Sequence, residues 1–160
     1  MRKLIDFYYR LLTWLLVATV AILIVPVTLQ IISRYTQLIP SYIWTEEMAR
    51  FLFIWMVMLG AMIGIREGTH FEVDVWPELS PRPNALLRIV SSVFVLAFAL
   101  VFVWYGIKFV QFGWDQNSEL AELPMTYIFL AWPITGITWL IFLGDTFIAN
   151  FRVLTRRTAQ

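Results

Sequence analysis

Four long runs of uncharged residues constrain the fold of this chain more than any other feature of its sequence. They hold 23, 15, 19 and 22 residues, and they lie at 11–33, 51–65, 89–107 and 123–144. A helix needs about 20 apolar residues to cross the hydrocarbon core of a bilayer. A globule of 160 residues could not bury four runs that are apolar on every side. The runs therefore predict helices that cross a membrane.

The second run reaches the required length only if its helix begins upstream, near Thr45, and includes three charged residues. With this extension we predict an all-α membrane protein in which residues 1–160 form one four-helix domain. The predicted transmembrane helices span residues 11–33, 45–65, 89–107 and 123–144. Pro26 and Pro133 lie inside the first and fourth spans, where each removes a backbone donor and is expected to kink its helix.

The composition excludes several classes of function. Hydrophobic residues make up 60% of the chain and charged residues only 14%, and the formal net charge is +1. A basic surface that could bind nucleic acid is therefore not predicted. The chain has no Cys and one His, which excludes disulfides, thiolate metal sites, iron–sulfur clusters and bis-histidine haem within it. No cofactor is predicted.

The distribution of Lys and Arg predicts the orientation in the membrane. Nine of the twelve lie before the first span, between the second and third, or after the fourth: Arg2, Lys3, Arg10, Arg66, Arg82, Arg88, Arg152, Arg156 and Arg157. The other three are Arg34, Arg50 and Lys108. Because cytoplasmic loops carry the excess of positive charge, both termini and the 66–88 loop are predicted to be cytoplasmic. The 34–50 and 108–122 loops then face outward.

Glu46, Glu47 and Arg50 are the charged residues that the second helix must carry. Their spacings of four and three residues allow either carboxylate to meet the guanidinium on one face. One interpretation is purely structural: Thr45 caps the helix, and the glutamates occupy a first turn where the helix dipole favours negative charge. The other is that Arg50, which is followed by an apolar run with Trp55, has a specific partner inside the membrane.

Two further groups of residues lie at or after the end of this helix. Gly60 and Gly64 form a G-x-x-x-G pattern that allows another helix backbone to approach closely, and we favour a packing face. In the loop that follows, His70, Glu72 and Asp74 alternate with apolar residues. This alternation favours an extended polar edge over a metal site, because a single imidazole is a poor basis for one.

The predicted outer loop between the third and fourth helices is acidic. It carries Asp115, Glu119 and Glu122 against Lys108 alone. These carboxylates could dock a partner or could simply be solvated. The sequence leaves both interpretations open.

The segment from Trp44 to Trp55, with the sequence WTEEMARFLFIW, resembles the small membrane subunit of TRAP (tripartite ATP-independent periplasmic) transporters, the DctQ-like family. The resemblance continues through Gly60, Ala61, Arg66, Gly68, His70 and Val73. It is supported by Ile32-Ser33-Arg34-Tyr35 before this segment and by Ser118, Leu123 and Pro124 after it. In length and helix count it extends over essentially the whole chain, although the third helix carries no diagnostic residues.

The resemblance implies a multi-pass protein of a bacterial or archaeal inner membrane, with two protein partners and surrounding lipid. One partner is a larger membrane subunit that holds the substrate and sodium sites and works as an elevator. The other is a periplasmic binding protein that delivers an organic acid. The small subunit would then be a scaffold that braces the fixed part of the large subunit.

Two alternatives remain beside this interpretation. A small proton-coupled carrier would use Glu46 or Glu47 as an intramembrane proton site. A membrane-embedded enzyme would need a cluster at the headgroup level, for which His70, Glu72 and Asp74 are the candidates. No nucleophile–histidine–acid set or phosphate-binding loop is present in the sequence, so we expect no enzyme.

Overall fold

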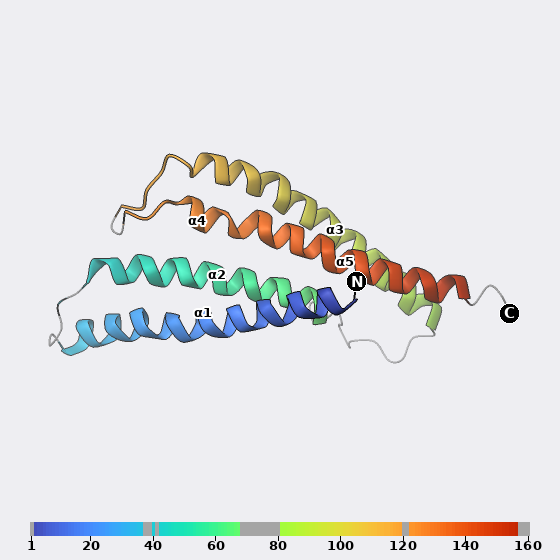
Figure 1. Ribbon diagram of the computed structural model, residues 1–160, viewed down its shortest axis with the longest axis horizontal. Helices are drawn as coiled ribbons and strands as arrows, with labels where there is room; N and C mark the ends of the chain where they lie inside the picture. Colours follow the sequence, from blue (N-terminus) through green and yellow to red (C-terminus); the bar gives the residue numbers. More distant parts are fainter. Residues whose placement is uncertain (1, 37–39, 41, 68–80, 120–121, 157–160) are drawn as a thin grey trace.

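The computed structural model describes residues 2–36, 40, 42–67, 81–119 and 122–156, with the backbone alone at 2, 43, 81–89 and 146–156. These residues form five helices (Figure 1): α1 Arg2–Thr36, α2 Ile43–Glu67, α3 Pro81–Phe112, α4 Thr126–Phe129 and α5 Ala131–Arg156. Apart from an isolated bridge between Asn117 and Pro124, the described residues form no β-structure. The predicted all-α fold is therefore confirmed.

Four helical segments are long and apolar enough to cross a membrane: Lys3–Thr36, Trp44–Glu67, Val90–Phe112 and Thr126–Asp145. They correspond to the four predicted spans. The helices extend beyond the uncharged runs and include the charged residues that flank them. Such residues can lie at helix ends because their long side chains reach the headgroup level. The second helix does include the glutamates and Arg50, as its length required.

Both prolines lie within helical spans. Pro26 is buried inside α1, and this helix continues through it. Pro133 lies in the fourth span, Thr126–Asp145, in which α4 and α5 are separated only at Leu130. Leu130 keeps helical dihedral angles, and its N–H donates to the carbonyl of Thr126 at 2.9 Å. Pro133 has no N–H to donate to the carbonyl four residues before it, and the kinks at the two prolines stay predictions.

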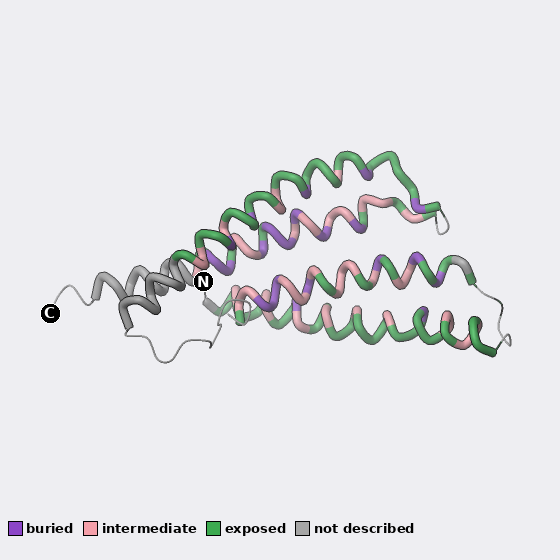
Figure 2. The backbone as a smooth tube through the Cα atoms, turned by 180° about the vertical axis from the view of Figure 1, so that it is seen from behind, coloured by how far each residue is buried: buried purple, intermediate pink, exposed green. Residues whose placement is uncertain are grey.

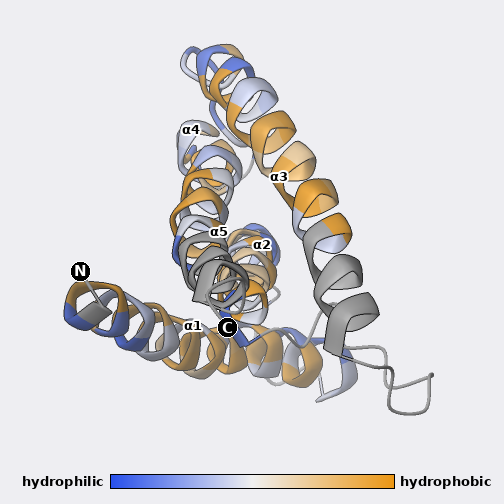
Figure 3. Ribbon diagram, turned by 90° about the vertical axis from the view of Figure 1, so that its right-hand side faces the viewer, coloured by the Kyte–Doolittle hydropathy of each residue, from blue (hydrophilic) through white to orange (hydrophobic). Residues whose placement is uncertain are grey.

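The helices form two antiparallel pairs, α1 with α2 and α3 with α5, and the pairs are joined where α2 packs against α5. Figures 2 and 3 show α2 and α5 in the middle and α1 and α3 on the flanks. Buried positions accordingly make up 44% of the fourth span and 28% of the second, but only 6% of the first. The connections from α1 to α2 and from α3 to α4 lie at the same end of the molecule, which we call the connector end. The opposite end is the terminal end.

Glycine allows α3 and α5 to approach closely. A Cβ atom on Gly136 would lie 2.8 Å from the carbonyl oxygen of Ala99 and 2.9 Å from the backbone nitrogen of Val103. A Cβ atom on Gly106 would lie 2.7 Å from Cδ of Pro133. Small residues at such crossings bring helix backbones together in a membrane, where apolar burial adds little. The sequence analysis did not single out either glycine.

The main cluster of buried apolar side chains joins α1, α2 and α5. Its members are Leu12, Leu59, Met62, Ile63 and Phe142. Beside this cluster the Tyr8 hydroxyl and Thr138 Oγ1 lie 2.7 Å apart, and the Trp139 indole donates a hydrogen bond to the Ala61 carbonyl at 3.1 Å. Polar contacts of this kind hold membrane helices together.

Candidate functional site

The connector end of α2 carries the charged residues that the sequence analysis singled out. The helix begins at Ile43, so Thr45 is its third residue and not the predicted cap. The hydroxyl of Thr45 donates to the carbonyl of Tyr42 at 2.7 Å, and its backbone N–H donates to the same carbonyl at 3.1 Å. Glu46 does lie in the first turn, where the helix dipole favours a carboxylate.

The two glutamates have different surroundings. Glu46 Oε1 lies 3.7 Å from Arg50 Nη2, and the two side chains are 70% and 64% exposed. Glu47 is 6% exposed, and its Oε2 accepts a hydrogen bond from the hydroxyl of Ser118. Of the two pairings that the spacing allowed, the structure forms the ion pair with Glu46. Glu47 instead joins α2 to the connection between α3 and α4.

That connection folds back on itself around Ser118. The backbone N–H of Ser118 donates to the carbonyl of Leu123 at 2.8 Å, and the N–H of Met125 donates to the carbonyl of Gln116 at 2.9 Å. The indole of Trp55 adds a second link from α2, because its Nε1 donates to the carbonyl of Tyr127 at 3.0 Å. Side chains of α2 thus contact the connection at Ser118 and α4 at Tyr127.

The acidic residues of this connection take no part in these two links. Asp115, Glu119 and Glu122 are all exposed, and Glu122 has a positive φ of 52°. Among the described residues no group of three or more His, Asp or Glu side chains could hold a metal ion. His70, Glu72 and Asp74 lie outside the described residues.

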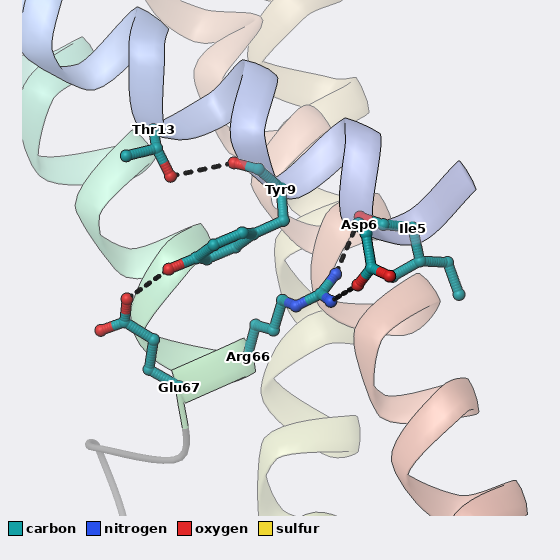
Figure 4. Close-up of polar contacts among 6 residues, drawn as sticks. All are labelled: Ile5, Asp6, Tyr9, Thr13, Arg66 and Glu67. Carbon is teal, nitrogen blue, oxygen red and sulfur yellow. Dashed lines mark hydrogen bonds and ion pairs between the residues drawn. The ribbon is translucent and has the colours of Figure 1, made fainter. Parts of the chain in front are cut away.

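Arg66 organises a polar cluster at the terminal end, shown in Figure 4. Its Nη1 donates to the carbonyl of Ile5 at 2.8 Å, and its Nη2 forms an ion pair with Asp6. The guanidinium carbon lies 4.8 Å from the ring centroid of Tyr9, whose hydroxyl donates to Glu67 Oε1 at 2.5 Å. The cluster fastens the last turn of α2 to the first turns of α1.

This cluster was not predicted from the sequence. Two features of the sequence could have indicated it. Arg66 and Glu67 directly follow the apolar run 51–65, and Asp6 lies with two tyrosines shortly before the run 11–33. In an antiparallel pair the end of one helix lies beside the start of the next, so opposite charges at those places are expected to meet.

The predicted glycine face of α2 is used only in part within this chain. Gly64 is buried, whereas a Cβ atom on Gly60 would have no other atom within 4 Å. The side of α2 at Gly60 is therefore open. The close helix approach within the described residues occurs at Gly106 and Gly136 on the other helix pair.

Comparison with known proteins places this arrangement among transporter subunits. The family description "Tripartite ATP-independent periplasmic transporters, DctQ component" matches residues 22–153. A putative TRAP transporter small permease protein of Haemophilus influenzae is 28% identical over 138 residues, which cover 86% of this chain and 85% of that protein. The sialic acid TRAP transporter small permease protein SiaQ of Vibrio cholerae is 30% identical over 142 residues, which cover 86% and 78%.

A longer relative contains a similar segment. The isethionate TRAP transporter permease protein DctMQ of Oleidesulfovibrio alaskensis is 29% identical over 128 residues. These residues cover 75% of this chain but only 20% of that protein. All three relatives are named as permease proteins.

Proposed function

Because this chain belongs to the DctQ component family of tripartite ATP-independent periplasmic (TRAP) transporters, we propose that it braces a larger membrane subunit during substrate uptake. It is a multi-pass inner-membrane protein and a small permease subunit, not an enzyme. The larger subunit would hold the substrate and sodium sites, and this chain would support the part of it that stays fixed.

The main support for the bracing role is that buried hydroxyl groups in α5 form hydrogen bonds within their own helix. Thr135 and Thr138 are fully buried in α5, and their hydroxyls donate to carbonyls of their own helix, at 2.7 and 2.8 Å. The charged side chains described in α2 lie towards its two ends. A charged substrate or sodium ion needs several oriented polar groups inside the membrane. The middle of this chain is better suited to packing than to binding such a ligand.

Two observations support pairing with a larger membrane protein. In DctMQ, a segment similar to this chain forms a fifth of a single permease. In addition, α1 and α3 leave most of their apolar surface uncovered, which suits contact with lipid and with another membrane protein. We infer that this chain makes the corresponding contact with a large permease subunit.

The substrate that we propose is an organic acid. SiaQ is named for sialic acid and DctMQ for isethionate, and both compounds carry an acidic group. The other two components of the transporter, the large subunit and a periplasmic binding protein, would determine which acid is taken up.

We also propose that the connector end faces the periplasm and the terminal end faces the cytoplasm. The support is the excess of nine Lys and Arg residues over three in the segments assigned to the cytoplasm. In this orientation Asp115, Glu119 and Glu122 are exposed on the side where a binding protein would deliver substrate. They are candidates for a docking contact with it.

Reconstitution in liposomes tests the proposal. We expect uptake of an organic acid only when this chain, the large subunit and the binding protein are all present and a sodium gradient is applied. Uptake by this chain alone, driven by a proton gradient, would support the carrier alternative and contradict the bracing role. In that case Glu47→Gln should abolish it, because Glu47 is the buried carboxylate of the two.

A further inference from the structure

One face of α2 is left uncovered by the other described residues of the chain. Its exposed residues are spaced by three or four, as expected for a single stripe along a helix. They are Glu46, Arg50, Phe53 and Val57, and Gly60 continues the series with open space beside it. We call these five residues the α2 stripe.

Arg50 makes this stripe a poor surface for lipid. It lies seven residues into α2, about 10 Å along the axis from the first residue of the helix. Within the described part of the chain its ion pair is with Glu46, at 3.7 Å, and about two thirds of the Arg50 side chain is exposed. A guanidinium has five N–H donors in a planar fork. Several of these donors therefore remain for an acceptor on another molecule.

The exposed side of α3 has a different character. Phe94, Phe98 and Val101 are uncharged and exposed, and the charge near the end of α3 is folded against aromatic rings. The Lys108 ammonium lies 5.4 Å from the Trp104 ring centroid. Aromatic residues and a lysine near a helix end are typical of a surface that faces lipid and the headgroup region. The α2 stripe carries its arginine without such a cover.

Gly60 provides the second feature of a docking surface. Since no atom of the described chain lies within 4 Å of the position of a Cβ atom there, the backbone of α2 is accessible from outside. Phe53 and Val57 extend the accessible face towards Arg50 with apolar side chains. A neighbouring helix could approach closely at the glycine and reach the guanidinium nearly three turns away.

We propose that the α2 stripe is the docking surface for a transmembrane helix of the large permease subunit. That helix packs closest at Gly60 and places an acceptor oxygen opposite Arg50. The charge argues for a protein occupant, because an acceptor fixed on a partner helix compensates the guanidinium inside the membrane. The inference rests on the proposed pairing with a large subunit and adds the face that makes the contact.

Photo-crosslinking tests this placement with two matched positions. Phe53 on the stripe and Phe98 on α3 are both exposed, at 54% and 62%, so replacing either with p-benzoylphenylalanine should leave the fold intact. The variants are co-expressed with the large subunit and irradiated in membranes. We expect a crosslink to the large subunit from position 53 and none from position 98. A crosslink from position 98 alone, equal crosslinks from both, or none from either in an intact complex would overturn the proposal.

A second pair of variants tests the role of Gly60. Gly60→Leu and Gly144→Leu both begin a side chain at a position where a Cβ atom would meet no atom of the described residues within 4 Å, so we expect both variants to fold. We expect Gly60→Leu to lower the affinity for the large subunit by about tenfold or more, with Gly144→Leu near the unsubstituted chain. Equal retention of both variants would overturn the close contact at Gly60. If the unsubstituted chain itself failed to bind the large subunit, the proposed function would fail instead.

Discussion

The close approach of α3 and α5 yields a prediction whose magnitude follows from the structure. In Gly136→Ala the new methyl group would lie 2.8 Å from the Ala99 carbonyl oxygen and from Val103 Cγ2, and 2.9 Å from the Val103 backbone nitrogen. Ordinary contacts of a Cβ atom begin at about 3.4 Å. Two of the three neighbours belong to the backbone, so a change of rotamer cannot relieve the clash. The helices must move apart by roughly half an ångström or more.

The cost of such overpacking is about 1 to 3 kcal/mol. Alanine also has a higher helix propensity than glycine, by about 1 kcal/mol, which partly offsets this cost. Gly144→Ala provides the matched control, because it lies in the same helix and its methyl group would meet no atom of the described residues within 4 Å. The propensity gain is common to both variants. The difference in stability between them therefore isolates the contact with α3, at about 1 to 3 kcal/mol.

Thermal unfolding in detergent micelles, followed by helical circular dichroism, measures this difference. For a chain of this size, 1 kcal/mol corresponds to about 2 to 4 °C in the melting temperature. We expect Gly136→Ala to melt about 2 to 12 °C below Gly144→Ala. Melting temperatures that agree within error would refute the close approach of the two helices.

Three further predictions concern the links at the two ends. Glu47→Gln and Ser118→Ala, made singly and together, should show a coupling of about 1.5 to 3 kcal/mol in unfolding free energy, whereas simple additivity would argue against the hydrogen bond. Arg66→Lys keeps the charge but loses the planar contacts with α1, so stability should fall by about 1 kcal/mol, and an unchanged melting curve would contradict this. In intact cells an impermeant thiol reagent should label Asn117→Cys and not Thr158→Cys, and the reverse pattern would invert the proposed topology.

The number and type of the helices could be predicted from the sequence because bilayer thickness imposes a length on each apolar run. Where the second run was too short, that same length predicted a helix that includes Glu46, Glu47 and Arg50, and α2 does include them. The boundary between α4 and α5 at Leu130 was not predicted from the apolar run, which continues through it. Pro133 was the available signal, and it marks the beginning of α5.

The separation of the two glutamates could not be predicted. Spacings of three and four residues both place a side chain near Arg50, so local geometry favours neither glutamate. What distinguishes them is the connection between α3 and α4, which brings Ser118 from 71 residues away to Glu47. A contact over that distance depends on how the two helix pairs meet, and periodicity along one helix carries no information about it.

The glycines also show that a pattern along one helix does not predict its contacts with other helices. A G-x-x-x-G pattern indicates that a helix can be approached, but the bulk of the neighbouring helix decides whether the approach is made. Gly136 lies opposite the small Ala99, and Gly106 lies opposite Pro133, so α3 and α5 meet where neither glycine belongs to such a pattern. Gly60 does belong to one, and nothing in the described chain fills the space beside it. Gly64 is buried within the chain, so the Gly60 side of this pattern is the part that we propose as a surface for a second chain.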